Sequence, residues 1–303
     1  MTDTRVPADL LFGSNVVAMV SPMKPDGSID EAAVTSLVAH LLSTGCDGIV
    51  VNGTTGESAT VSGEEGLQLI RQVKAQVQGQ ARVIAGVGTY DTRATIARAQ
   101  AAEEAGADAL LLVTPYYNRP TQAGVVAHTR AVADSTGLPI MLYDVPARTG
   151  LALSPATIVE LAAHPRIQAI KDAKGDIFEA LTVMARTGLA YYSGIDELNL
   201  PYLASGAVGV VSVVGNVVAD RNAELIKAVR EHDLERAQEV AKALIPLTDA
   251  IMRTSSGAIM AKAALAEIGV VPSAAVRLPL LESPDEDLRK LRAALLTIAT
   301  PVA

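Results

Sequence analysis

The sequence contains no tryptophan, a single cysteine and few aromatic residues of any kind. One cysteine, Cys46, cannot form an internal disulfide, which is typical of proteins in a reducing compartment. No apolar stretch reaches the roughly 20 uninterrupted residues that a membrane helix requires, and no secretory signal pattern is present. We therefore expect a cytoplasmic protein that has no membrane partner.

Basic clusters and metal-ligand motifs are also missing. The formal net charge is −8 and no Lys/Arg cluster interrupts this acidic balance, which disfavours a nucleic-acid-binding surface. The four histidines are scattered and show no spacing of the H-x-x-x-H kind, so we expect no metal site. Small molecules are the expected partners.

What the chain does contain is a regular alternation of short apolar runs and longer helical patterns. Its 303 residues, 50% of them hydrophobic, suffice for one large α/β barrel. Nearly continuous apolar runs separated by one helix each are typical of parallel strands covered on both faces. Eight such runs predict an α/β protein of the (β/α)8 TIM-barrel class rather than an open sheet. The runs span 15–23, 48–52, 82–88, 109–115, 139–145, 167–172, 189–194 and 209–215.

The pattern changes near Arg230, beyond which three helical stretches follow one another without an intervening strand. We therefore expect the barrel and a short N-terminal extension in residues 1–232, and a small all-helical domain in residues 233–303. The first dozen residues and the proline-containing link at 272–284 are expected to be irregular.

Lys171 stands in the middle of the run 167–172, which otherwise reads as a buried strand. Because burial disfavours the ammonium form, such a lysine can supply a neutral amine that attacks a carbonyl carbon and forms an imine. The alternative is a lysine at an exposed strand end, paired with Asp172, and solvated lysines of that kind are far more common.

Polar residues gather where the predicted strands end, which is where barrels of this class form their active sites. Gly53-Thr54-Thr55-Gly56 can present N–H groups and hydroxyls to a small anion, although such a string alone is commonly an ordinary turn. The phenols of Tyr117 and Tyr143 can both donate and accept a proton. Arg148 is either a clamp for a carboxylate or an ordinary surface arginine.

Four ordered motifs give these residues a specific resemblance. Gly-Thr-Thr-Gly-Glu-Ser, Thr-Pro-Tyr-Tyr-Asn-Arg-Pro, Tyr-Asp-Val-Pro-Ala-Arg-Thr and Ile-Lys-Asp-Ala begin at residues 53, 114, 143 and 170. In this order and spacing they resemble the dihydrodipicolinate synthase / N-acetylneuraminate lyase family of Schiff-base aldolases. The resemblance implies a condensation of pyruvate with L-aspartate 4-semialdehyde to 4-hydroxy-tetrahydrodipicolinate, the first committed step of diaminopimelate and lysine biosynthesis.

The resemblance also implies the catalytic groups. Lys171 would form the imine with pyruvate, and Tyr143 would transfer protons beside it. Thr54 and Tyr117 would extend a hydroxyl relay, with Tyr117 reaching in from a neighbouring subunit of a homotetramer built as a dimer of dimers. No cofactor is implied, because the iminium is itself the electron sink.

The same resemblance implies the residues that bind substrate. Thr55 would hold the pyruvate carboxylate, and Arg148 the carboxylate of the semialdehyde or of the cyclised product. Gly194 and Val211 would line the pocket with their backbone.

Three departures from the family pattern affect specificity and regulation. The segment from Arg253 to Met260 lacks the Asn-Pro-rich form seen in many relatives of the family. Ile195-Asp196 stands where the synthases commonly carry two acidic residues. Lysine-inhibited members line an allosteric cleft with polar His and Asn residues, and the matching places here are Gly63, Gly66 and Tyr90. We therefore expect weak or absent inhibition by lysine.

Two alternatives to the synthase reaction remain open. A sibling lyase, such as N-acetylneuraminate lyase or a 2-keto-3-deoxy sugar acid aldolase, more often carries Ser at the place of Thr54 and lacks the arginine matched by Arg148. A non-catalytic small-molecule-binding barrel would be expected to have lost Lys171 or Tyr143, and both are present.

Overall fold

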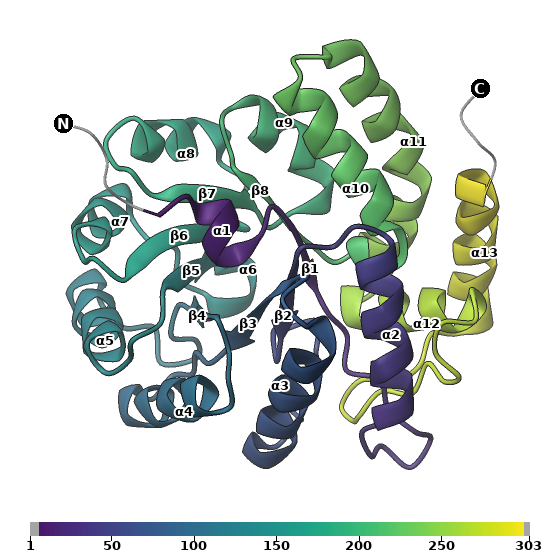
Figure 1. Ribbon diagram of the computed structural model, residues 1–303, viewed down its shortest axis with the longest axis horizontal. Coiled ribbons are helices and arrows are strands. Elements are labelled where there is room, and N and C mark those ends of the chain that lie inside the picture. The colour runs from purple at the N-terminus through teal and green to yellow at the C-terminus, as the bar shows by residue number, and fades with distance from the viewer. Residues whose placement is uncertain (1–5, 300–303) are drawn as a thin grey trace.

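The computed structural model describes residues 6–299 and contains a closed barrel of eight parallel strands (Figure 1). The strands are paired in chain order, and β8 closes the barrel by pairing with β1. Each apolar run of the sequence contains one strand, so the predicted (β/α)8 architecture is confirmed. The strands are β1 (Asn15–Ala18), β2 (Gly48–Val51), β3 (Arg82–Gly86), β4 (Ala109–Val113), β5 (Ile140–Asp144), β6 (Ile167–Asp172), β7 (Ala190–Ser193) and β8 (Gly209–Ser212).

Helices connect the strands and surround the barrel (Figure 1). Several begin at side-chain caps, among them Asp30 and Ser62, whose oxygens accept hydrogen bonds from the first turn. Within residues 6–299, no helix is both long and apolar enough to cross a lipid bilayer. The connecting helices are α2 (Glu31–Ser43), α3 (Gly63–Val77), α4 (Thr92–Glu104), α5 (Gln122–Asp134), α6 (Pro146–Thr149), α7 (Pro155–Ala162), α8 (Ile177–Met184), η1 (Asp196–Leu198), α9 (Asn199–Ala204) and α10 (Gly215–Arg230).

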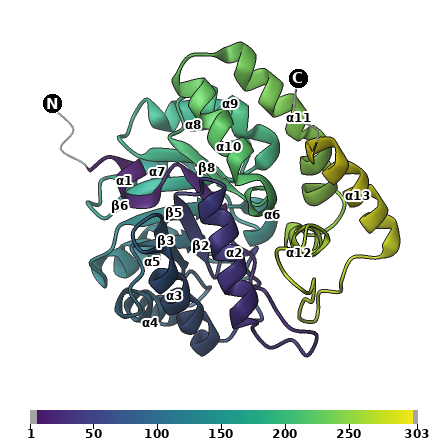
Figure 2. The same cartoon turned by 45° about the vertical axis from the view of Figure 1, so that its right-hand side comes forward.

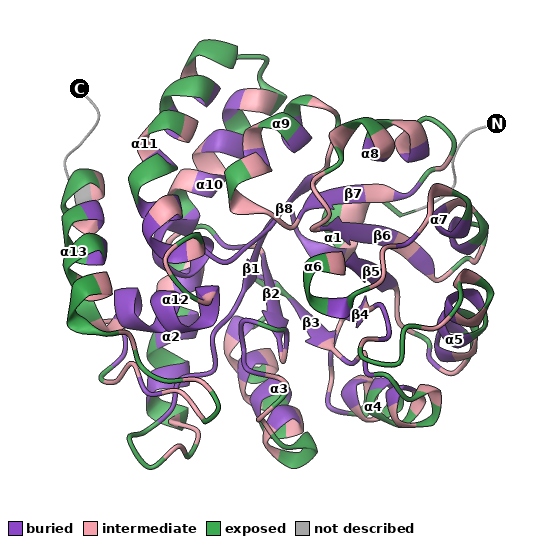
Figure 3. Ribbon diagram, turned by 180° about the vertical axis from the view of Figure 1, so that it is seen from behind, coloured by how far each residue is buried: buried purple, intermediate pink, exposed green. Residues whose placement is uncertain are grey.

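The strand side chains form two apolar cores because successive residues of a strand point to opposite faces. One core fills the barrel and includes Val16, Ile84 and Met141. The other lies between the strands and the helices and includes Val17 and Leu142. Figure 3 shows the result, with buried residues on the strands and exposed residues on the outer faces of the helices.

The first dozen residues differ from expectation, because a short helix, α1 (Ala8–Phe12), precedes the first strand. Phe12 is fully buried and packs edge-on against Tyr192 inside the barrel, with ring centroids 6.3 Å apart. The Tyr192 hydroxyl donates a hydrogen bond to the Gly13 carbonyl at 2.8 Å. These contacts order a segment that is too short to show helical periodicity. Residues 1–5 lie outside the described part of the chain.

Three helices follow the barrel and lie together on one side of it (Figure 2). They are α11 (Leu234–Met252), α12 (Gly257–Glu267) and α13 (Asp285–Ala299). Helix α11 packs against both α10 and α13, so the helical part continues the outer layer of the barrel. The division into two domains at residue 232 remains our proposal, supported by the absence of strands in residues 233–299 of the structure.

An ion pair between Glu65 and Arg277 predicts acid sensitivity of the fold. Hydrogen bonding by Arg277 lowers the pKa of Glu65 from 4.5 to about 2. This contribution to the free energy of unfolding is present above pH 4.5 and is lost as the pH falls toward 2. Partial exposure of the pair limits it to about 1 kcal/mol.

Urea unfolding at pH 6 and pH 3 tests this expectation. Glu65→Gln should reduce the difference in unfolding free energy between the two pH values by about that amount. Glu64→Gln, on an exposed position of the same turn, is the control and should leave the difference unchanged. An unchanged difference in Glu65→Gln would contradict the prediction.

Candidate active site

A cavity of about 200 Å³ opens at the carboxyl ends of the strands. It is lined by the loop after β2, by the ends of β5 and β6, and by the start of α12. Six residues that the sequence singles out share this cavity: Thr54, Thr55, Tyr143, Arg148, Lys171 and Gly194. The barrel therefore brings together groups that are far apart in the sequence.

Lys171 lies inside the barrel end rather than at an exposed strand terminus. Its side chain is buried, and β5 and β6 pair in a register that puts it beside Tyr143. The Lys171 Nζ lies 4.3 Å from the centroid of the Tyr143 ring. No carboxylate forms an ion pair with Lys171 among residues 6–299, and Asp172 instead accepts a hydrogen bond from the Lys174 N–H at 2.8 Å. The pairing of Lys171 with Asp172 considered from the sequence is absent.

Lys174 binds the carboxylates that follow Tyr143 and Lys171 in the sequence, Asp144 through its ammonium and Asp172 through its backbone N–H. Asp144 and Asp172 are buried on the other face of β5 and β6, as strand alternation requires. Burial raises the pKa of Asp144 to about 6, and the nearby Lys174 ammonium opposes that shift. The Lys174 Nζ lies 3.3 Å from Asp144 Oδ2. These two carboxylates are thereby kept on the outside of the barrel wall, away from Lys171.

The Gly53–Gly56 segment is a tight turn that also lines the cavity. The Gly56 N–H donates to the Gly53 carbonyl at 3.0 Å, and the Ser21 hydroxyl donates to the Gly56 carbonyl at 2.7 Å. Thr55 is buried within the turn, whereas Thr54 is exposed. The motif is therefore a tight turn that places both threonines at the cavity, and anion binding by this turn stays a prediction.

Two predicted site residues lie away from the cavity in the single chain. Tyr117 has a left-handed backbone conformation, with φ of 68°, and its side chain is 90% exposed. Val211 is buried in the barrel core, and Val213 lines the cavity instead. Arg148 is exposed on α6, at the mouth of the cavity.

Comparison with known proteins places this arrangement in a family. Residues 11–298 match the model of the Dihydrodipicolinate synthetase family. The chain belongs to this family. It is 49% identical over 96% of its length to 4-hydroxy-tetrahydrodipicolinate synthase of Acidothermus cellulolyticus, of which it covers 94%. It is 48% identical over 93% of its length to the enzyme of the same name from Kineococcus radiotolerans, of which it covers 92%.

A solved structure of the family shows the same fold. The chloride-inhibited dihydrodipicolinate synthase from Acinetobacter baumannii, complexed with pyruvate, matches with a TM-score of 0.91 and 38% identity. The match covers 94% of this chain and 98% of that one. The resemblance inferred from four short motifs is thereby confirmed along nearly the whole chain.

Several residues that line the cavity had not been assigned to the site from the sequence. Met252, Ser256, Gly257 and Ala258 come from the junction of α11 and α12. The sequence marks residues 253–260 only as a departure from the family pattern, because they follow a helix rather than a strand and carry no distinctive chemistry. The C-terminal helices are therefore part of the site and not only an appendage.

Asp196 of the Ile195-Asp196 departure has a structural role in the cavity wall. Its carboxylate accepts hydrogen bonds from the Ser212 hydroxyl and from the N–H groups of Val213, at 2.9 Å, and Val214, at 3.2 Å. These bonds tie η1 to the end of β8. Among the residues that line the cavity, Glu197 carries the carboxylate.

Close packing of Gly194 against Lys171 yields a prediction. A Cβ at this position would lie 2.9 Å from both Lys171 Cγ and the Asp172 carbonyl oxygen. Gly194→Ala should therefore displace Lys171 and slow imine formation with pyruvate by at least about tenfold. Gly63→Ala, where a Cβ has nothing within 4 Å, is the control. Quenching the reaction with borohydride at successive times measures the rate of imine formation with pyruvate. Equal rates for wild type and Gly194→Ala would contradict the prediction.

Proposed function

We propose that this chain is a lyase that condenses pyruvate with L-aspartate 4-semialdehyde to 4-hydroxy-tetrahydrodipicolinate. The observation that carries the proposal is the buried Lys171 amine, which faces the cavity without a carboxylate partner in the described chain. An amine that faces a cavity and is not bound by a carboxylate is placed to attack a carbonyl carbon. The names of the relatives support the same reaction.

In this proposal Lys171 Nζ attacks the keto carbon of pyruvate, and the carbonyl oxygen leaves as water. The resulting iminium withdraws electrons, so the methyl group loses a proton and becomes the terminal carbon of an enamine. That carbon attacks the aldehyde carbon, the new carbon–carbon bond forms, and the aldehyde oxygen takes up a proton. The positive nitrogen accepts and returns the electron pair, so the chemistry needs no cofactor. The amino group of the semialdehyde then attacks the iminium carbon, which closes the ring, and the bond to Lys171 breaks as the lysine leaves as a free amine.

Tyr143 is the group that we assign to proton transfer. Its ring lies against Lys171 Nζ, and its phenol can donate and accept a proton on the same oxygen. Thr54 lines the same cavity and would extend the relay. Tyr117 would complete it from a second subunit, because it is exposed and lies outside the cavity of its own chain.

Substrate carboxylates are assigned to the loop after β2 and to α6. Thr55 and the neighbouring N–H groups would hold the pyruvate carboxylate, since a tight turn concentrates donors at one point. Arg148 at the cavity mouth would bind the carboxylate of the semialdehyde through its planar guanidinium. Gly194 would line the pocket between these two positions.

We further propose a homotetramer in the cytoplasm. The exposure of Tyr117 supports an assembly, because the relay proposed above needs this side chain to enter the cavity of a second subunit. The thiol of Cys46 is free and buried, which fits a reducing compartment.

Removal of the proposed nucleophile tests the reaction. Lys171→Ala should lower turnover of pyruvate and aspartate semialdehyde by at least about a thousandfold, and Tyr143→Phe by roughly 100-fold or more. A coupled reductase assay measures both. Lys74→Ala on the surface of α3 is the control and should retain full activity.

The choice of aldehyde separates the synthase from its sibling lyases. Turnover of N-acetylneuraminate or a 2-keto-3-deoxy sugar acid, with no turnover of aspartate semialdehyde, would overturn the proposal. The sibling reactions are not favoured by the relatives, which carry the synthase name.

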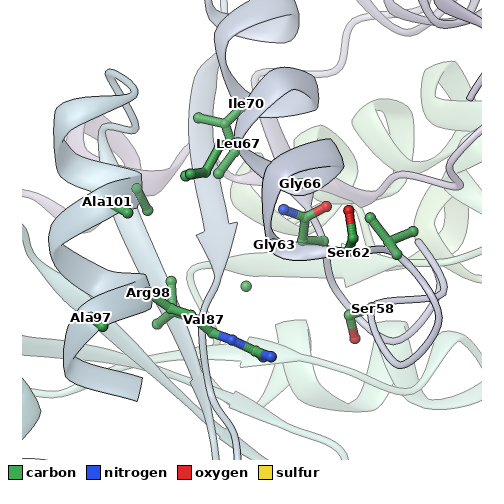
Figure 4. A pocket seen from close by; sticks show the side chains of 14 residues that line it. Ser58, Ser62, Gly63, Gly66, Leu67, Ile70, Val87, Ala97, Arg98 and Ala101 are labelled. Carbon is green, nitrogen blue, oxygen red and sulfur yellow. The ribbon is translucent and has the colours of Figure 1, made fainter. Parts of the chain in front are cut away.

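Weak inhibition by lysine is a second expected property of the enzyme. Gly63 and Gly66 line a cavity of about 220 Å³ between α3 and α4, next to Ser58 (Figure 4). Arg98 is the charged residue that lines this cavity, and its positive charge disfavours the ammonium groups of lysine. Initial rates in the presence of L-lysine should show no micromolar inhibition constant. Such a constant would contradict the prediction.

A further inference from the structure

A buried ion pair connects α12 to the loop after β2. The ammonium of Lys262, on α12, pairs with the Glu57 carboxylate, and both side chains are only 1% exposed. The Lys262 Nζ also donates to the Ala275 carbonyl at 2.8 Å. Burial of two charges costs a large desolvation energy, and an apolar pair of similar volume is often no less stable. Stability alone therefore does not account for this pair.

Glu57 belongs to the same turn as the two threonines that line the cavity. Its N–H donates to the Thr54 carbonyl at 3.1 Å, and its backbone is left-handed, with φ of 56°. A left-handed glutamate is uncommon and persists where surrounding contacts hold it. Its second carboxylate oxygen accepts a hydrogen bond from the Arg277 N–H at 3.0 Å. The side chain of Glu57 thus fixes the end of the turn.

Arg277 attaches the segment beyond Glu57 to the C-terminal part of the chain. Its guanidinium donates to the Thr60 carbonyl at 2.7 Å and to the Gly27 carbonyl at 2.8 Å, and it pairs with Glu65. The stretch from Glu57 to Glu65 is therefore held from outside the barrel at several points. None of these contacts is made by a residue that lines the cavity.

Helix α12 contributes to the cavity through its first residues, Gly257 and Ala258. Lys262 lies about one turn further along the same helix. The Glu57–Lys262 pair consequently joins two walls of one cavity, the threonine turn and the start of α12. An ion pair with defined hydrogen bonds fixes both distance and direction, which apolar contact alone does not do.

We propose that Glu57 and Lys262 are positioning residues that hold Thr54 and Thr55 in place for the carboxylate of pyruvate. They touch neither substrate nor Lys171 and act through the turn. This inference rests on the proposed function, because it assigns a purpose to the turn in the binding of pyruvate.

An apolar double variant distinguishes a role of the ion pair in placing Thr54 and Thr55 from a role in the stability of the fold. Glu57→Leu/Lys262→Met fills the same space without charge, and its thermal midpoint should equal or exceed that of Lys262→Met. The KM for pyruvate in the double variant should nonetheless rise about tenfold, with kcat changed less than about threefold. Glu267→Gln is the matched control, because it breaks the exposed ion pair of α12 with Arg292 and should leave KM unchanged.

A double variant with the thermal midpoint and the pyruvate KM of wild type would overturn the inference. If the double variant does not fold, the pyruvate KM of Glu57→Gln tests the inference instead, because this substitution keeps the shape of the side chain. A rise in its KM of at least about threefold supports the inference, and an unchanged KM overturns it. Borohydride trapping of the wild-type enzyme with pyruvate is run first. Failure of trapping there contradicts the proposed function, whereas normal trapping with unchanged variants contradicts only the positioning role.

Discussion

The site depends on a lysine held in a protein interior without a counter-charge. Lys174 and Lys262 are also largely withdrawn from water, and each contacts carboxylates. Lys171 contacts the face of an aromatic ring instead. An amine that no carboxylate binds is available to form an imine, which is the role that we propose for Lys171. In the proposed reaction Lys171 carries the covalent chemistry, whereas Lys174 and Lys262 make ion pairs within the fold.

Strand alternation determines which side chains of β5 and β6 face the cavity. Tyr143 and Lys171 point into the barrel end from adjacent strands, and the next residues, Asp144 and Asp172, point outward. A shift of register by one residue would place carboxylates in the cavity and the nucleophile outside it. Closure of the barrel prevents such a shift, since every strand is paired on both sides. The closed barrel therefore fixes the placement of Lys171 and Tyr143 on which the proposed reaction depends.

Much of this could be predicted from the sequence, because strands and barrel-end residues leave local signals. Apolar runs indicate the strands, and polar motifs at their ends indicate Thr55, Tyr143 and Lys171. The pair of Glu57 and Lys262 could not be predicted, because its members are 205 residues apart and a buried lysine in a helix looks like a surface one. Gly257 was not assigned to the cavity from the sequence, because it follows a helix rather than a strand and carries no distinctive chemistry. Helix α1 was missed because its order comes from the burial of Phe12 and not from periodicity.

The site of imine formation is the most direct measure of this account. Pyruvate is trapped on the enzyme with borohydride, and the reduced adduct is located by mass spectrometry of the peptides. The account predicts that the adduct lies on Lys171 and that Lys174 and Lys262 remain unmodified, although all three are withdrawn from solvent. An adduct on either of the paired lysines, or activity that survives without any adduct on Lys171, would contradict it.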